Sequence, residues 1–232
     1  MKALVAIAGH HRGGTSATAG AVRRMGVYFG QENELMPAAP ENPKGFTEHL
    51  ELVAIHDQLL NGLRLTWDSH SPLPARWRRG FPYRRALERL VGLVTDLAES
   101  VDEDQAIGVK DPRMARLAPL WVDVAKQAGV KLAPLVVMRD PRAVGDSLVA
   151  RNRWERNRAW QFVSTQEGGL HEWLEVPGAR RVRFPDLLEW RTKLWPAVCP
   201  VLAGHALYAG DAMALVEEAV DAFLEVGLVH HG

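Results

Sequence analysis

The sequence contains a single cysteine, Cys199, and no excess of charge of either sign. One cysteine excludes a disulfide framework within the chain and is typical of a reducing compartment, so we expect a cytoplasmic location. Cys199 is more simply explained as a small buried apolar side chain than as a nucleophile. Lysine and arginine number 28, as do aspartate and glutamate. The chain therefore has no net positive charge that would predict binding to nucleic acid, and any charge-driven binding must come from local clusters of charged residues.

Long apolar runs are also missing. No stretch approaches the roughly 18 consecutive apolar residues of a membrane span, so none is expected. The apolar segment 3–8 is followed by glycine and histidines rather than by a cleavage site, which predicts a buried strand and not a secretory signal. Hydrophobic residues make up 47% of the chain, enough for a sizeable core, and 232 residues fit one domain, 1–232.

Short apolar runs alternate with amphipathic segments along the chain. Strands are expected at 3–8, 106–109, 132–138 and 180–184. Helices are expected at 15–25, 48–62, 83–100, 117–128, 141–152, 185–194 and 211–226. This alternation predicts an α/β fold of three layers, α/β/α, with a mostly parallel central sheet like that of P-loop nucleotide-binding proteins. Such sheets bind ligands beyond the carboxyl ends of their strands.

The segment 9–16, GHHRGGTS, follows the first expected strand. It has the glycine spacing and closing hydroxyl of the nucleotide loop G-x-x-x-x-G-K-[ST], but Thr15 stands where the lysine belongs. Arg12 supplies a guanidinium from inside the loop instead. Backbone N–H groups at a helix start favour an anion, and glycine allows its close approach. The residues expected to bind this anion are Arg12, Gly13, Gly14, Thr15 and Ser16.

Two more charged turns follow expected strands. Lys110 comes at the end of the second strand, and Arg139 directly follows the third. Ser147 lies eight residues beyond Arg139, about two helical turns, so the pair can bracket a further phosphate. The alternative is that Arg139 pairs with Asp140 or Asp111 and that Ser147 is an ordinary helix residue.

Taken together, these turns resemble the sulfotransferases that use 3′-phosphoadenosine 5′-phosphosulfate (PAPS), bacterial members included. The loop Arg12-Gly13-Gly14-Thr15-Ser16 resembles the 5′-phosphosulfate loop of this family, and the segment from Arg139 to Ser147 resembles its 3′-phosphate motif. The turn Lys110-Asp111-Pro112 resembles a lysine turn of the family. The stretch Asn42-Pro43-Lys44-Gly45-Phe46-Thr47-Glu48 resembles the pattern N-P-K-G-[FY]-x-E of bacterial members. The likeness covers 1–155 and is weak beyond it, where the G-x-x-G-x-x-K ending of cytosolic members is missing.

The resemblance implies an enzyme that moves a sulfonate from PAPS to a hydroxyl of a small molecule or carbohydrate and releases adenosine 3′,5′-bisphosphate (PAP). It implies no obligatory metal, and it implies that Arg12 and Lys110 neutralise the leaving phosphate. A base must then take the acceptor proton. Glu48 is favoured and Glu32 is next. The remaining candidates are Glu34, His49 and His56.

Two other functions stay open. A P-loop phosphotransferase needs a loop lysine and an aspartate for Mg²⁺, and only the aspartates are available, at positions 111 and 140. A non-catalytic nucleotide-binding domain would keep the loop and lack a base. The basic, aromatic segments 76–85 and 151–160 are either solvated faces or part of an acceptor site. The sequence does not indicate an oligomeric state.

Overall fold

The computed structural model describes residues 1–39, 42, 45–184, 189, 194–202, 214 and 217–221. Four strands form its sheet in the order β2-β1-β3-β4, and every pair runs parallel. Their bounds are Ala3–Gly9 for β1, Ile107–Lys110 for β2, Lys131–Met138 for β3 and Arg180–Arg183 for β4. Because all four run the same way, their carboxyl ends meet at one edge of the sheet.

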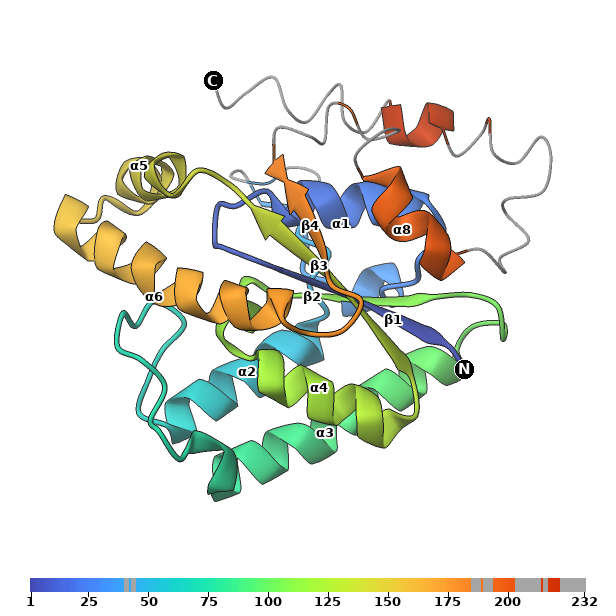
Figure 1. Cartoon of the computed structure of the whole chain (residues 1–232), viewed down its shortest axis with the longest axis horizontal. Coiled ribbons are helices and arrows are strands. Elements are labelled where there is room, and N and C mark those ends of the chain that lie inside the picture. The colour runs from blue at the N-terminus through green and yellow to red at the C-terminus, as the bar shows by residue number, and fades with distance from the viewer. Residues whose placement is uncertain are drawn as a thin grey trace.

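Helices cover both faces of this sheet (Figure 1). On one face lie α1 (Thr15–Arg24) and α8 (Trp195–Leu202). The other face carries α2 (Leu50–Gly62), α3 (Phe81–Glu99), α4 (Ala118–Ala128) and α6 (Arg156–Leu174). Helix α5 (Pro141–Asn152) follows β3 at the carboxyl edge and packs on α6. Short 3₁₀ turns occupy Glu32–Glu34 (η1), Trp77–Arg79 (η2) and Pro112–Arg116 (η3).

Alternate side chains of β1 point to opposite faces of the sheet, so the hydrophobic core has two parts. Leu4, Ala6 and Ala8 pack toward α2, α3 and α4, whereas Val5 and Ile7 pack toward α1 and α8. All five side chains are buried. A strand buried on both faces reads as an unbroken apolar run, which is why the segment was recognisable in the sequence. The three-layer α/β fold with a parallel sheet is therefore confirmed.

The predicted elements agree with the observed ones to within about two residues through α5. The nineteen-residue helix α6 was not predicted. Two consecutive glycines, Gly168 and Gly169, weaken its helical pattern, and its start has no side-chain cap.

The C-terminal predictions are only partly covered by the structure. The helix expected at 185–194 falls almost wholly outside the described residues, and of 211–226 only 214 and 217–221 are described, as helical. Cys199 lies partly buried in α8. Within the described ranges, no helix is both long and apolar enough to cross a bilayer.

Candidate functional site

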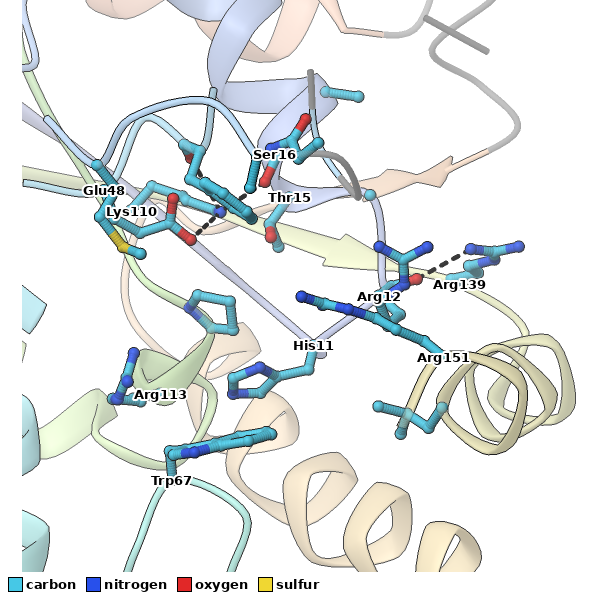
Figure 2. Close-up of a pocket in the computed structure, with 18 of the residues that line it drawn as sticks. His11, Arg12, Thr15, Ser16, Glu48, Trp67, Lys110, Arg113, Arg139 and Arg151 are labelled. Carbon is cyan, nitrogen blue, oxygen red and sulfur yellow. Dashed lines mark hydrogen bonds and ion pairs between the residues drawn. The ribbon is translucent and has the colours of Figure 1, made fainter. Parts of the chain in front are cut away.

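A cavity of about 530 Å³ opens at the carboxyl edge of the sheet (Figure 2). Its walls come from the loop after β1, residues 36–39, 42, 46 and 48, the turn after β2, Arg139 just before α5 and the end of α5. The predicted residues that line it are Arg12, Gly14, Thr15, Ser16, Glu48, Lys110 and Arg139. The remaining two, Gly13 and Ser147, bond to loop residues beside it. Segments far apart in the sequence thus share one cleft.

The loop after β1 has an open helix start. Gly14 occupies the N-cap position of α1 with φ of 91°, and no side chain caps the helix. A Cβ at Gly14 would collide with the Phe184 ring, so glycine is required there. Arg12 also has a positive φ, 64°, an uncommon conformation for a residue with a side chain. The Gly13 N–H donates to the His10 carbonyl at 2.9 Å, so in this structure that donor is paired within the turn.

Arg12, Arg139 and Ser147 form one hydrogen-bonded group. Arg12 Nε donates to Ser147 Oγ at 3.1 Å, and Arg139 Nη1 donates to the Arg12 carbonyl at 2.9 Å. The Arg139 guanidinium also lies 4.8 Å from the centre of the Phe184 ring. The Asp140 side chain accepts from the N–H groups of Arg142 and Ala143, so it caps α5. Arg12, in the loop after β1, and Arg139, directly after β3, therefore lie on the same wall of the cavity.

Lys110 brings the end of β2 to the phosphate loop. Its side chain is only 1% exposed, and its ammonium lies 2.8 Å from Ser16 Oγ, 3.1 Å from the Phe46 carbonyl and 2.5 Å from Glu48 Oε1. An ammonium has three N–H donors, and these three partners use all of them. Lys110 must therefore exchange a partner in order to bind a ligand.

Glu48 is a buried carboxylate held by that lysine. Thr47, just before it, has φ of 61°, which is a strained backbone conformation for a β-branched residue. Burial raises the pKa of Glu48, and the charge and hydrogen bond of Lys110 oppose this rise. Its second oxygen, Oε2, is buried and has no hydrogen-bond partner among the described residues. A carboxylate with a raised pKa and an unused oxygen suits a proton acceptor.

The other four base candidates lie outside this cavity wall. Glu32 and Glu34 belong to η1, and the Glu34 carboxylate accepts from the Gln31 N–H. The His49 side chain accepts from the backbone of Glu51 at the start of α2. His56 is fully buried and bonds to an aspartate rather than facing the cavity.

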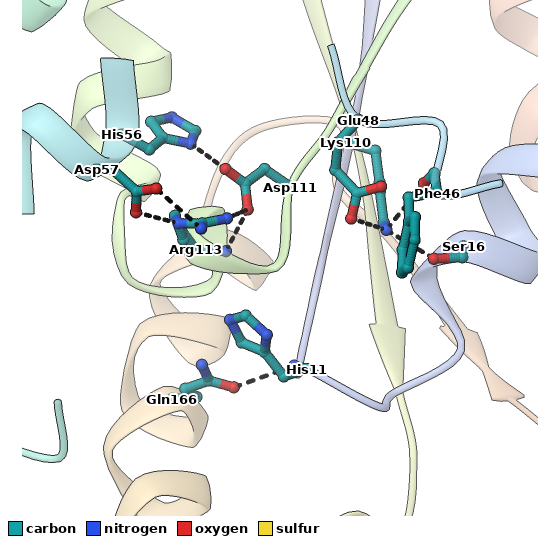
Figure 3. Close-up of polar contacts among 10 residues, drawn as sticks. All are labelled: His11, Ser16, Phe46, Glu48, His56, Asp57, Lys110, Asp111, Arg113 and Gln166. Carbon is teal, nitrogen blue, oxygen red and sulfur yellow. Dashed lines mark hydrogen bonds and ion pairs between the residues drawn. The ribbon is translucent and has the colours of Figure 1, made fainter. Parts of the chain in front are cut away.

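That aspartate, Asp111, belongs to a buried ionic network (Figure 3). Its Oδ2 lies 2.7 Å from His56 Nδ1, its Oδ1 accepts from Arg113 at 3.0 Å, and Arg113 also pairs with both oxygens of Asp57 at 2.7 and 3.1 Å. Burial raises the pKa of Asp111, but the bond with His56 and the charge of Arg113 outweigh it and hold the pKa well below its usual range. Among the described residues, no group of three or more histidine, cysteine or acidic side chains could hold a metal ion.

His11 and Trp67 line the cavity and were not assigned to the site from the sequence. Their ring centres lie 5.0 Å apart, and the backbone N–H of His11 donates to Gln166 Oε1 at 3.3 Å. Burial lowers the pKa of His11 to about 3, and the nearby charges of Arg113, Lys110 and Arg151 add to this against the opposing charge of Asp111, so the imidazole is neutral. The unusual histidine pair in the loop was the one available sequence signal for His11. Trp67 lies in an irregular segment and had none.

Comparison with known proteins bears on the fold. No family model matches the sequence, and no curated protein matches it significantly. Among solved structures, the sulfotransferase domain from the curacin biosynthetic pathway superposes with a TM-score of 0.51 at 14% identity, over 91% of this chain and 80% of that one.

The chain has the fold of a sulfotransferase domain. A second such domain, from the Synechococcus PCC 7002 olefin synthase, is 14% identical over 98% of this chain and 89% of its own, with a TM-score of 0.46. In this sulfotransferase fold the three charged turns meet at the carboxyl edge of the sheet, where the resemblance in sequence leads us to expect the donor site.

Proposed function

We propose that the protein transfers a sulfonate group from PAPS to a hydroxyl group of an acceptor and releases PAP. Arg12, the helix start at Gly14 to Ser16, and Lys110 would hold the 5′-phosphosulfate. Arg139 and Ser147 would hold the 3′-phosphate. The likeness in fold to a sulfotransferase domain supports this assignment, and so does the convergence of these cations on one cavity.

The observation that carries the proposal is the position of Lys110. In a P-loop phosphotransferase, the hydroxyl after the loop lysine binds Mg²⁺. Here the corresponding hydroxyl, that of Ser16, accepts a hydrogen bond from the Lys110 ammonium at 2.8 Å. A divalent cation bound to the same hydroxyl would lie beside the ammonium and be repelled by it. The arrangement therefore favours a donor whose charge is neutralised by side chains.

The chemistry follows from these neighbours. PAPS supplies an activated sulfonate and a phosphate leaving group. Glu48 would take the hydroxyl proton of the acceptor as the acceptor oxygen bonds to sulfur. The bond between sulfur and the bridging oxygen breaks, and its electron pair stays on the 5′-phosphate. Lys110 and Arg12 would stabilise that growing charge, and the dry surroundings of Lys110 strengthen the effect.

Ligand-dependent melting tests the donor. We expect PAP to stabilise the protein by about 2.7 kcal/mol at a hundredfold excess over its Kd, AMP to stabilise it less because it has no 3′-phosphate, and ATP with Mg²⁺ to stabilise it least. A preference for ATP with Mg²⁺ would overturn the proposal in favour of a phosphotransferase. Transfer of labelled sulfonate from PAPS then separates an enzyme from a domain that only binds the nucleotide.

A matched pair of arginine variants tests the 3′-phosphate assignment by calorimetry. Arg139→Ala should weaken PAP binding by about 1.5–3 kcal/mol, because a charged hydrogen bond is lost, and should leave AMP binding nearly unchanged. Arg142→Ala removes an exposed arginine of α5 that does not line the cavity, so it should bind PAP as the wild type does. Unchanged PAP affinity in Arg139→Ala would remove that residue from the site.

A further inference from the structure

The cavity has two chemically different sides (Figure 2). One side carries the guanidinium groups of Arg12, Arg139 and Arg151. The Trp67 ring lies away from these guanidinium groups (Figure 2), and we call the apolar part of the lining, to which Met36, Pro37, Ala38, Phe46, Trp67 and Pro112 belong, the apolar side. A donor nucleotide bearing phosphates fits the cationic side. The apolar side is therefore where an acceptor has to lie.

Trp67 is the largest side chain of this apolar side, and the loop that carries it is fixed at several points. Asp68 pairs with Arg158 of α6 at 2.5 Å, and Thr165 of the same helix donates to the His70 carbonyl at 2.7 Å. Arg116, itself only 7% exposed, donates to the carbonyls of residues 69 and 71. Three independent tethers hold the loop in one place, so it forms a preformed wall.

The Trp67 ring is also packed against other aromatic rings. It stacks on Trp154 with ring centres 5.9 Å apart and meets the edge of Phe162 at 6.3 Å. His11 contacts it from the loop at 5.0 Å. Trp67 is nevertheless 36% exposed. A rigid, supported indole that remains exposed at a cavity wall offers stacking area to a flat ligand at little cost in entropy.

The polar groups on this side are few, and most are already paired. The Arg113 guanidinium is taken up by Asp57 and Asp111, and all three donors of Lys110 are used. Among the buried side-chain polar atoms of the described lining residues, those without a hydrogen-bond partner are Glu48 Oε2 and His11 Nε2. Each buried hydroxyl left without a partner costs about 1–3 kcal/mol. A polyhydroxylated sugar would leave several in that state, whereas a single hydroxyl would be satisfied.

Resting on the sulfonate transfer proposed above, we propose that the acceptor is a flat, apolar molecule with one reactive hydroxyl, a phenol or aryl alcohol, which stacks on Trp67 and directs its hydroxyl toward Glu48. The reaction forms an aryl sulfate ester. The phenolic oxygen bonds to sulfur, its proton passes to Glu48, and PAP leaves. Carbohydrates are then excluded as acceptors.

Calorimetry on the full chain saturated with PAP tests this without relying on turnover. The two probes are 2-naphthol and methyl β-glucoside. The variants are Trp67→Ala, Trp67→Phe and the control Phe81→Ala, which removes an aromatic ring that is 65% exposed and lies outside the cavity. PAP should bind all four proteins equally, which also checks that the variants fold.

We expect 2-naphthol to bind the wild type and Phe81→Ala equally, Trp67→Ala about tenfold more weakly, and Trp67→Phe between them, because a stacked ring pair contributes about 0.5–1.5 kcal/mol beyond its buried area. The glucoside should not bind. Equal naphthol binding by the wild type and Trp67→Ala, or tighter binding of the glucoside, would overturn the aryl acceptor and leave the donor assignment standing. Failure of PAP to bind the wild type would overturn the donor assignment and this inference together.

Discussion

The ion pair between Lys110 and Glu48 makes a strong prediction about stability. The two side chains are 1% and 6% exposed and lie 2.5 Å apart. Removing one partner of a buried pair leaves an uncompensated charge and costs about 3–5 kcal/mol, whereas replacing both by neutral groups of similar size costs far less. We therefore expect Lys110→Met and Glu48→Gln each to lower the free energy of unfolding by about 3–5 kcal/mol, and the double variant to lose less than either one.

Urea unfolding of the four proteins at neutral pH measures this coupling as a double-mutant cycle. The Lys110→Met variant carries a second check. Because its Glu48 is buried without a cation, its pKa rises further above the already raised wild-type value. The loss of stability in Lys110→Met should therefore shrink as the pH falls and the carboxylate takes up a proton.

An exposed pair provides the control. Arg89 and Glu51 lie 3.2 Å apart with side chains 31% and 48% exposed, so the same cycle on them should give less than about 1 kcal/mol of coupling. The reasoning fails if the Lys110 and Glu48 single variants each lose less than about 1 kcal/mol and their effects add. That result would mean that water reaches the pair and that Lys110 is not held in a dry site.

Three further predictions concern packing and pH. In α6, Gly169→Ala should strongly destabilise the protein, because its Cβ would collide with the Ala115 carbonyl. Gly168→Ala has open space around its Cβ and should stabilise the protein by up to about 1 kcal/mol. Equal melting temperatures of the two variants would contradict this prediction. Asp111→Asn should cost about 2–3 kcal/mol at neutral pH, and because the folded-state pKa of Asp111 is lowered, this difference should fade as the pH falls below about 4 in acid unfolding. Turnover should drop as the pH falls through the raised pKa of Glu48, and the residual turnover of Glu48→Gln should lack that acid limb; an unchanged limb would assign it to another group.

Much of the fold was readable from local pattern. The buried strands appear as unbroken apolar runs because both faces of a parallel sheet are covered, and the helices on either side carry ordinary 3.6-residue periodicity. Helix α6 was not predicted because its two glycines and its uncapped start contradict local helix signals. Its position is decided by close approach to the η3 backbone at Gly169, a contact between segments that lie far apart in the chain.

The sequence determined by itself which cations stand at the ends of strands, because strand ends are visible in the apolar pattern and the carboxyl ends of parallel strands must meet. Arg12, Lys110 and Arg139 could therefore be chosen from the sequence alone as candidate anion-binding residues. Only the tertiary structure decided which donors are already used, such as the Gly13 N–H and the Lys110 ammonium. It also decided that Trp67 reaches the cavity, because that depends on tethers from residues 116, 158 and 165. Hydrogen-bond pairing and burial are properties of neighbours in space, and no local pattern records them.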